Sequence, residues 1–235
     1  MIRHAQNFDH AEQSKFDALA TEWWDINGPL SILHDINPTR FKYIKRYTSL
    51  HNKKILDVGC GGGILTEIMA LDGGLVTGID IAKHLIRIAS NHAQQTNIDI
   101  CYRCTTIEEL LPAEENKYEI ITCMELLEHV PNPSSVINAC SKLLKPKGWL
   151  FFSTINRNLR AYLQTKIIAE YLCKLLPIGT HDYAKYSYPS EIAAYCRACS
   201  LTVVDVSGFS YLPLLRRSYI KDKPDVHYFL CAQAI

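Results

Sequence analysis

The sequence has little net charge and no segment that resembles a targeting signal. Its 235 residues include 25 lysines and arginines against 24 aspartates and glutamates, for a formal net charge of +1. Such a balance creates no strong field for nucleic acid, so we expect no nucleic-acid partner. The N-terminal region carries charges throughout, and no apolar run is long enough for a signal peptide or a membrane span. We therefore expect a protein that is neither exported nor transmembrane.

The cysteines form no recognisable metal or disulfide framework. There are nine of them, an odd number, and most lie inside apolar runs. Two CxxC pairs, Cys101/Cys104 and Cys196/Cys199, are too far apart along the chain for a zinc ribbon. We expect reduced thiols that serve as small apolar side chains in the cytosol, and no structural zinc.

Short apolar strands alternate with helices through most of the chain, which is typical of a parallel sheet covered on both faces. No helical pattern separates the last two apolar runs, so the final strand is predicted to fold back antiparallel. The strands are expected at 54–58, 75–80, 98–104, 118–124, 149–155, 201–209 and 226–234, and the helices near 64–71, 82–96, 133–144 and 189–199. This pattern predicts an α/β, Rossmann-like fold with a seven-stranded sheet.

Two helices are expected before the first strand. Apolar and aromatic residues at helical spacing predict one amphipathic helix over 9–24. A second is expected from about Asn37, a good cap followed by Pro38, to about Leu50. We accordingly divide the chain into an N-terminal helical cap (1–50) and one larger domain (51–235), with a helical insert at about 157–187.

A glycine-rich loop follows the first strand and suggests a nucleoside site. Glycines at 59, 61, 62 and 63 permit positive φ angles and let a ligand lie against bare backbone at a helix N-terminus. Asp80 ends the second strand, where a carboxylate can accept both hydroxyls of a ribose. A dinucleotide fingerprint starting at Gly59 would need a small residue at position 64, where the chain has Ile64. The loop instead resembles the GxGxG loop of S-adenosylmethionine methyltransferases. A nicotinamide dehydrogenase, a catalytically silent cofactor-binding module and a ligand-free turn remain as alternatives.

The expected cofactor contacts lie at the carboxyl ends of four strands, where an open sheet binds its ligand. Segment 104–112, after the third strand, is where this class borders the adenine, and Met124 ends the fourth strand at the switch point. The predicted cofactor-binding set from these segments is Asp57, Gly59, Cys60, Gly61, Asp80, Ile81, Thr106, Ile107 and Met124.

The segment after the fourth strand holds the candidate catalytic groups. It lacks the Asn/Asp-Pro-Pro-aromatic pattern of enzymes that methylate base amines, which argues against such acceptors. Glu125, Glu128 and His129 stand at i, i+3 and i+4, so one helical turn would put them on one face. Such a set suits Mg²⁺ holding two catechol oxygens, or a histidine base that removes a phenolic proton. The alternative is a capping histidine with two solvated glutamates.

Four segments together resemble the O-methyltransferases of ubiquinone biosynthesis. They are "LDVGCGGGILTE", "TCMELLEHVPNP", "FFSTINRN" and "GTHDYAKYSYPSEI", in this order. The resemblance implies two methylations of polyprenyl catechols, on 2-polyprenyl-6-hydroxyphenol and on 3-demethylubiquinol. It also implies cofactor contact by Arg40, Gly59, Asp80 and Met124. In the same way it implies Mg²⁺ at Glu125, Glu128 and His129. Association with other ubiquinone-pathway enzymes is a further hypothesis. Between Gly208 and Asp225 the chain lacks the family's Tyr-Asn-Pro turn, so the resemblance does not predict which residues form that wall of the acceptor pocket. Another small phenol or carboxylate is the alternative acceptor.

The insert suggests a membrane contact. Apolar residues from Ile167 to Leu176 form one stripe, opposite Lys166, Glu170 and Lys174. Such a helix either packs on the core or dips into a headgroup layer to guide a lipid-dissolved acceptor. With a polyprenyl substrate, we expect peripheral contact through 164–178 at the inner face of the cytoplasmic membrane.

Overall fold

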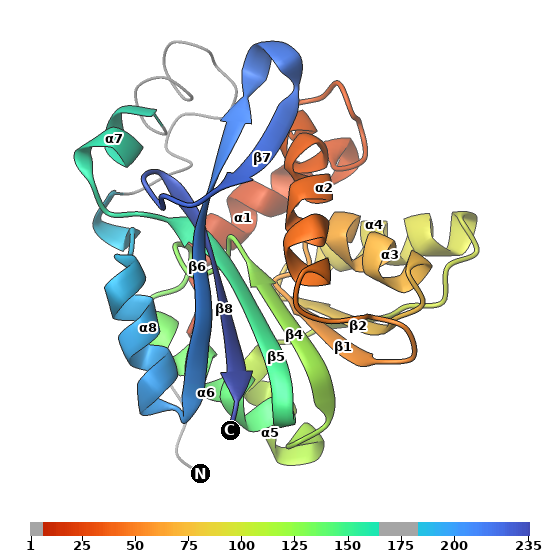
Figure 1. Cartoon of the computed structure of the whole chain (residues 1–235). Coiled ribbons are helices and arrows are strands. Elements are labelled where there is room, and N and C mark those ends of the chain that lie inside the picture. Colours follow the sequence, from red (N-terminus) through yellow and green to blue (C-terminus); the bar gives the residue numbers. More distant parts are fainter. Residues whose placement is uncertain (1–6, 165–182) are drawn as a thin grey trace.

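A computed structural model describes residues 7–164 and 183–235 as one mixed sheet with helices on both faces (Figure 1). The helices are α1 (His10–Ala18), α2 (Ser31–Lys45), α3 (Ile64–Leu71), α4 (Lys83–Gln95), α5 (Ile107–Glu114), α6 (Pro133–Leu143), α7 (Leu159–Tyr162) and α8 (Pro189–Ala198), with short 3-10 turns η1 (Ala20–Glu22), η3 (Tyr183–Lys185) and η4 (Pro213–Leu215). The strands are β1 (Lys54–Val58), β2 (Leu75–Asp80), β3 (Cys101–Cys104), β4 (Tyr118–Met124), β5 (Leu144–Ile155), β6 (Leu201–Leu212), β7 (Arg217–Lys221) and β8 (His227–Ala234).

The sheet order is β3-β2-β1-β4-β5-β8-β6-β7. The first five strands in this order are parallel, and β8 pairs antiparallel with both β5 and β6. The α/β class and the reversed final strand are therefore confirmed. The expected count of seven strands is wrong, because β7 forms an eighth strand at the edge beyond β6. β7 lies at the edge of the sheet and is only partly buried, so it needs few apolar side chains. Its short, polar "RSYIK" segment therefore lacks the apolar pattern that predicts a strand.

Alternate residues of the central strands belong to two hydrophobic clusters, one on each face of the sheet. Leu56 and Ile121 pack in a cluster with α5, α6 and α8, whereas Ile55 and Ile120 pack on the other face with α2 and α3. Both faces of β1 and β4 are thus buried, which explains why these strands read as continuous apolar runs. A third cluster joins the residues around η1 to the starts of α3 and α4.

The N-terminal helices differ from the expectation. The single helix over 9–24 is wrong: α1 ends at Ala18, and a separate turn η1 follows. Both tryptophans after the break contact the glycine loop. The Trp23 ring packs on Gly61 and Gly62, whereas Trp24 donates from Nε1 to the Gly62 carbonyl at 3.0 Å and stacks on His92 at 3.5 Å between ring centroids.

The second helix also begins elsewhere. α2 starts at Ser31 and ends at Lys45, so Pro38 lies inside it and Asn37 caps nothing. The Asn37 side chain is buried and donates a hydrogen bond of 3.0 Å to the Ile64 carbonyl, at the start of α3. This contact fixes α2 against the glycine-loop helix, and burial of α2 outweighs its unfavourable proline.

The remaining predicted helices are confirmed to within about one residue at each end. α5 was not predicted, although Thr106 and Glu109 form a capping box that marks its start. Most of the expected insert at 157–187 lies outside the described residues, apart from α7 and η3. The division at residue 50 stays a prediction. Within the described part of the chain, no helix has the length and apolar character that crossing a membrane requires.

Glu114, the last residue of α5, links this helix to β3 and β4. Its carboxylate accepts hydrogen bonds from Arg103 in β3, from Lys117 and from the Tyr118 hydroxyl in β4. Burial alone would raise the pKa of Glu114, but these three donors outweigh it and lower the pKa to about 2.

We therefore expect Glu114→Gln to lower the free energy of unfolding at pH 7 by about 1–2 kcal/mol, after allowance for solvent around the two cations. The stabilisation should be complete above the usual carboxyl pKa of 4.5 and be lost as the pH falls towards about 2. Urea denaturation of wild type and variant at several pH values checks this, with Glu115→Gln at the exposed next position as control. A difference that stays constant with pH would contradict the assignment.

Candidate active site

A cavity of about 790 Å³ opens at the carboxyl ends of the parallel strands. The glycine loop, the N-terminal segment, α2, the loop after β4 and the β6–β8 edge all line it. This volume suits a drug-sized ligand or two smaller molecules side by side. The cavity brings together most predicted site residues, namely Arg40, Asp57, Gly59, Cys60, Gly61, Asp80, Ile81, Met124, Glu125, Glu128 and His129.

The glycine loop needs its glycines for backbone conformation. Gly59, Gly61 and Gly63 have φ angles of +70°, +55° and +93°, in the left-handed region that costs other residues free energy. The amides of Gly59 and Cys60 both donate to the Ile79 carbonyl, at 2.9 and 3.0 Å, which fastens the loop to β2. The Cys60 thiol is buried beside Gly78, so its backbone rather than its side chain is offered to a ligand.

Two carboxylates hold this end of the cavity, the buried Asp57 and the half-buried Asp80. Asp80 accepts from the amides of Gly61, at 3.0 Å, and Ala82, at 2.8 Å, so it anchors the loop as well as facing the cavity. Asp57 accepts from the hydroxyls of Thr66 and Thr122, each at 2.7 Å. Burial raises the pKa of Asp57 to about 6 despite these donors. Burial likewise raises the pKa of Asp80.

A smaller hollow adjoins the cavity between β2 and α5. Ile81, Thr106 and Ile107 line it, together with Asp80. Its flat apolar sides and nearby backbone suit an adenine ring. The structure therefore places the third-strand segment beside Asp80, while Met124 lies in the main cavity.

Trp23 covers the glycine loop, a role that the sequence did not reveal. A Cβ at Gly61 would lie 2.4 Å from the Trp23 ring, and one at Gly62 would lie 2.2 Å from it. Phe16 packs edge-on against Trp23, with 6.5 Å between ring centroids, and both rings line the cavity. The tryptophan pair was the available signal, but its helical spacing suggested only core packing.

Arg40 lies buried in α2 and forms an ion pair with Glu125. Its Nε is buried and has no hydrogen-bond partner among the described residues. Glu125 has a φ of +54°, and it also accepts from the Ser153 hydroxyl at 3.3 Å. A left-handed glutamate is costly unless its surroundings hold it, and here the bond to Arg40 does so. Arg40 also lines the cavity, where its guanidinium can interact with an anionic group.

The arrangement of Glu125, Glu128 and His129 differs from the expected helical face. Residues 127–129 form a turn rather than a helix, and Glu125 is held by Arg40. Glu128 is buried and accepts from the Thr154 hydroxyl at 2.7 Å. Among residues 7–164 and 183–235, no three histidine, cysteine, aspartate or glutamate side chains gather as a metal site. The predicted Mg²⁺ set does not fit, because each carboxylate is committed to a protein partner.

His129 nevertheless lies in the cavity, edge-on to Phe16 with 5.1 Å between ring centroids. Burial raises the pKa of the neighbouring Glu128 carboxyl, while the charge of His129 opposes that shift. The two groups therefore interact, although they do not share a helical face. An imidazole in this position can accept a proton from a ligand hydroxyl.

The far wall of the cavity is aromatic and was missed by the sequence analysis. Phe209 and Tyr211 in β6, Tyr219 in β7 and His227 in β8 supply it. The wall includes part of the segment that departs from the Tyr-Asn-Pro turn. Its residues come from the hairpin of β6 and the unpredicted β7, which is why the sequence could not place them together.

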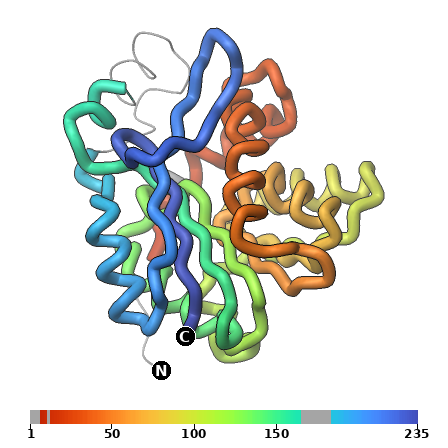
Figure 2. Tube along the Cα trace, in the orientation of Figure 1, coloured from red at the N-terminus to blue at the C-terminus, as the bar shows by residue number. Residues whose placement is uncertain are grey.

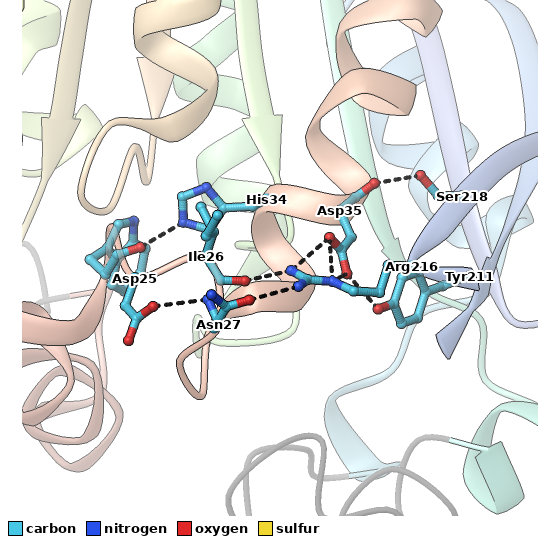
Figure 3. Close-up of polar contacts among 9 residues, drawn as sticks. Asp25, Ile26, Asn27, His34, Asp35, Tyr211, Arg216 and Ser218 are labelled. Carbon is cyan, nitrogen blue, oxygen red and sulfur yellow. Dashed lines mark hydrogen bonds and ion pairs between the residues drawn. The ribbon is translucent and has the colours of Figure 1, made fainter. Parts of the chain in front are cut away.

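Arg216 fastens this hairpin to the N-terminal segment (Figure 3). Its guanidinium binds Asp35 in α2, at 3.1–3.2 Å, and also the Asn27 side chain and the Ile26 carbonyl. Tyr211 donates to the same Asp35 carboxylate at 2.6 Å. Figure 2 shows the hairpin beside the N-terminal helices, which are distant in the sequence. The wall of the cavity is therefore built by both ends of the chain.

Comparison with known sequences finds a matching domain family and relatives that span nearly the whole chain. Residues 56–152 match the family model described as "Methyltransferase domain". The chain is 49% identical over 224 residues to the ubiquinone biosynthesis O-methyltransferase of Azotobacter vinelandii, covering 95% of this chain and 97% of the relative. It is 47% identical over 231 residues to the enzyme of the same name from Coxiella burnetii, covering 98% of each.

Solved structures support the fold alone. A magnesium protoporphyrin IX methyltransferase from Synechocystis PCC 6803, crystallised with SAH, matches with a TM-score of 0.67 at 16% identity, over 95% of this chain and 100% of that one. A SAM-dependent methyltransferase from Aquifex aeolicus matches with a TM-score of 0.64 at 14% identity, over 95% and 98% of the two chains.

The loss of stability caused by alanine at Gly61 and at Gly62 should depend differently on the presence of Trp23. Gly62→Ala and Gly61→Ala should each lower stability and S-adenosylhomocysteine affinity, because the Trp23 ring must move. In a Trp23→Ala background, Gly62→Ala should cost little, whereas Gly61→Ala should still cost about 1–2 kcal/mol for its left-handed backbone. Urea unfolding and calorimetric titration measure both effects. Equal costs of Gly62→Ala in the two backgrounds would show that Trp23 is not the constraint.

Proposed function

Because the chain belongs to the ubiquinone biosynthesis O-methyltransferases, we propose that its cavity holds S-adenosylmethionine beside a polyprenyl catechol and transfers the methyl group to one catechol oxygen. The chain is a SAM-dependent O-methyltransferase. The acceptors we propose are 2-polyprenyl-6-hydroxyphenol and 3-demethylubiquinol.

One observation carries the proposal: a single cavity extends from the glycine loop to the loop of His129 and to an aromatic wall. A cofactor and an aromatic acceptor can therefore lie in contact without crossing bulk water. Holding two reactants in line at about 3–3.5 Å supplies much of the acceleration in such transfers. The aromatic wall suits a catechol ring and the start of a prenyl chain.

The cofactor end supplies matched polar groups. We assign the Arg40 guanidinium to the methionine carboxylate, since Arg40 is a fixed cation that lines the cavity. Asp80 is assigned to the ribose hydroxyls, and the hollow at Thr106 and Ile107 to the adenine. Glu125 keeps the Arg40 side chain in place through their ion pair.

His129 is assigned as the general base. A free phenol has a pKa of about 10, so the attacking oxygen must lose its proton near neutral pH. In this step His129 takes the proton, the oxygen forms a bond to the methyl carbon, and the carbon–sulfur bond breaks to leave S-adenosylhomocysteine. The buried Glu128 carboxylate stabilises the imidazolium that forms. We route no step through a metal, since the carboxylates are bound to Arg40 and Thr154.

Replacement of His129 tests both the function and this role. Wild type should methylate an alkyl catechol with S-adenosylmethionine, and His129→Ala should lower kcat by about 10²–10⁴-fold while S-adenosylhomocysteine affinity changes little. Product formation is followed by mass spectrometry, with and without a chelator, and His51→Ala is the remote control.

Undiminished turnover by His129→Ala would refute the base assignment. Absence of any catechol methylation by wild type would refute the proposed acceptor class. Loss of turnover with chelator would mean that a divalent ion rearranges the carboxylates described above.

We also propose that the protein contacts a membrane where the polyprenyl acceptor resides. The predicted contact segment, 164–178, lies outside the described residues except for Gln164. Support comes from the tip of the β6–β7 hairpin, where Leu214 is fully exposed and Leu215 is 64% exposed. Leu212 and Pro213, just before them, line the cavity. α7, with exposed Leu159, lies at the same end of the molecule (Figure 1). Apolar side chains beside the cavity suit an acceptor that enters from lipid.

Removal of the tip leucines should weaken lipid binding. We expect Leu214→Ser/Leu215→Ser to lower the affinity for anionic vesicles by about tenfold, through lost apolar contact with the bilayer. Co-sedimentation measures it, and Leu71→Ser, a 71% exposed leucine in α3, is the matched control. Equal lipid binding by both variants and wild type would remove the hairpin from this role.

A further inference from the structure

His227 lies at the edge of the sheet where the ligands bind. It begins β8, opposite Ile155, the last residue of β5, and opposite Phe209 in β6. Because side chains alternate along a strand, it shares a face with Phe229 and Cys231, which pack on the α2 side of the sheet. His227 also lines the main cavity. Its position therefore faces the acceptor end of the site.

The imidazole of His227 is held in place by packing. No hydrogen bond joins it to another described residue. Its ring lies against Phe209, with 5.0 Å between centroids and 33° between planes. The Nδ1 atom is buried and has no hydrogen-bond partner within residues 7–164 and 183–235. Packing on Phe209 requires only an aromatic ring, so a phenylalanine would satisfy it without burying a polar atom. An unpartnered buried nitrogen is costly, and such groups in native proteins commonly mark a functional site.

The surroundings of His227 favour its neutral form. Burial lowers the pKa of the imidazole, and Lys221 and Arg40 act in the same direction, against Glu125 and Asp225. A neutral imidazole carries one donor and one acceptor nitrogen. A catechol presents two adjacent hydroxyl oxygens, of which only one receives the methyl group. The second oxygen therefore needs a polar partner. On the aromatic wall the Tyr211 hydroxyl is already bonded to Asp35, whereas the His227 imidazole can supply such a partner.

We infer that His227 hydrogen-bonds an oxygen of the acceptor ring and so determines which ring oxygen faces the methyl group. The inference rests on the proposed function and extends it to the selection of the acceptor. We assign His227 to the acceptor because it belongs to the aromatic wall with Phe209, whereas the proposed cofactor contacts come from β1, β2, α2 and β4. Nδ1 is buried, so the inference includes a rotation of the ring about its Cβ–Cγ bond that turns this nitrogen towards the acceptor.

Three substitutions separate the hydrogen bond from the packing. His227→Phe keeps the ring against Phe209 and removes both nitrogens, whereas His227→Asn and His227→Gln place an amide near Nδ1 and Nε2, respectively. We expect His227→Phe to lower kcat/KM for an alkyl catechol by about three- to tenfold, mainly through KM. It should also yield a mixture of the two monomethylated isomers. One of the amide variants should restore both the rate and the single isomer.

S-adenosylhomocysteine affinity and the thermal midpoint serve as controls for folding, and His51→Phe controls for an aromatic replacement elsewhere. The inference is overturned if His227→Phe retains wild-type KM and isomer ratio, or if neither amide variant recovers them. These outcomes require that wild type methylates the catechol, so failure of the proposed function shows separately as an inactive wild type.

Discussion

The site depends on a loop in which two positions, Gly61 and Gly62, leave no room for a side chain. Gly61 and Gly62 lie beneath the Trp23 ring, while the Asp80 carboxylate binds the Gly61 amide from the opposite side. The loop is thus held from the N-terminal segment and from the second strand at once. A nucleoside placed against it meets backbone of fixed shape, which lowers the entropy lost on binding. Asp80 has two roles, since the same carboxylate that shapes the loop faces the cavity.

A second constraint links the cofactor end to the catalytic loop. Glu125 ends the fourth strand in a left-handed conformation and is bound to Arg40. Three residues further on, Glu128 is buried and bonded to Thr154. The two carboxylates therefore have different partners, Arg40 for Glu125 and Thr154 for Glu128. Spacing alone suggested a shared task, because i, i+3 and i+4 coincide on a helix but diverge in a turn.

The sequence predicted those parts that follow from local rules. Strands β1, β2, β4 and β8, the glycine loop and helices capped by Asn132 or preceded by Gly63 were placed within about one residue. The expected bounds of three strands are wrong: β5 begins at Leu144 rather than 149, β3 at Cys101 rather than 98, and β6 ends at Leu212 rather than 209. Errors arose where distant packing outweighs local preference, as with Pro38 inside α2 and the break between α1 and η1. The edge strand β7 has too few apolar residues to be recognised, and His227 resembles any histidine at the start of a strand. Trp23 and His227 reach the cavity only through contacts between remote segments, which periodicity does not record.

The bonds of Arg216 impose an order on the assembly of the site. This side chain, near the C-terminal end, binds Ile26, Asn27 and Asp35, up to 190 positions earlier in the chain. During synthesis the N-terminal segment emerges long before its partner exists, and contacts of such separation form late. The aromatic wall cannot close until the last strands have been translated and docked. A truncated nascent chain would therefore retain the glycine loop while lacking an enclosed reaction chamber.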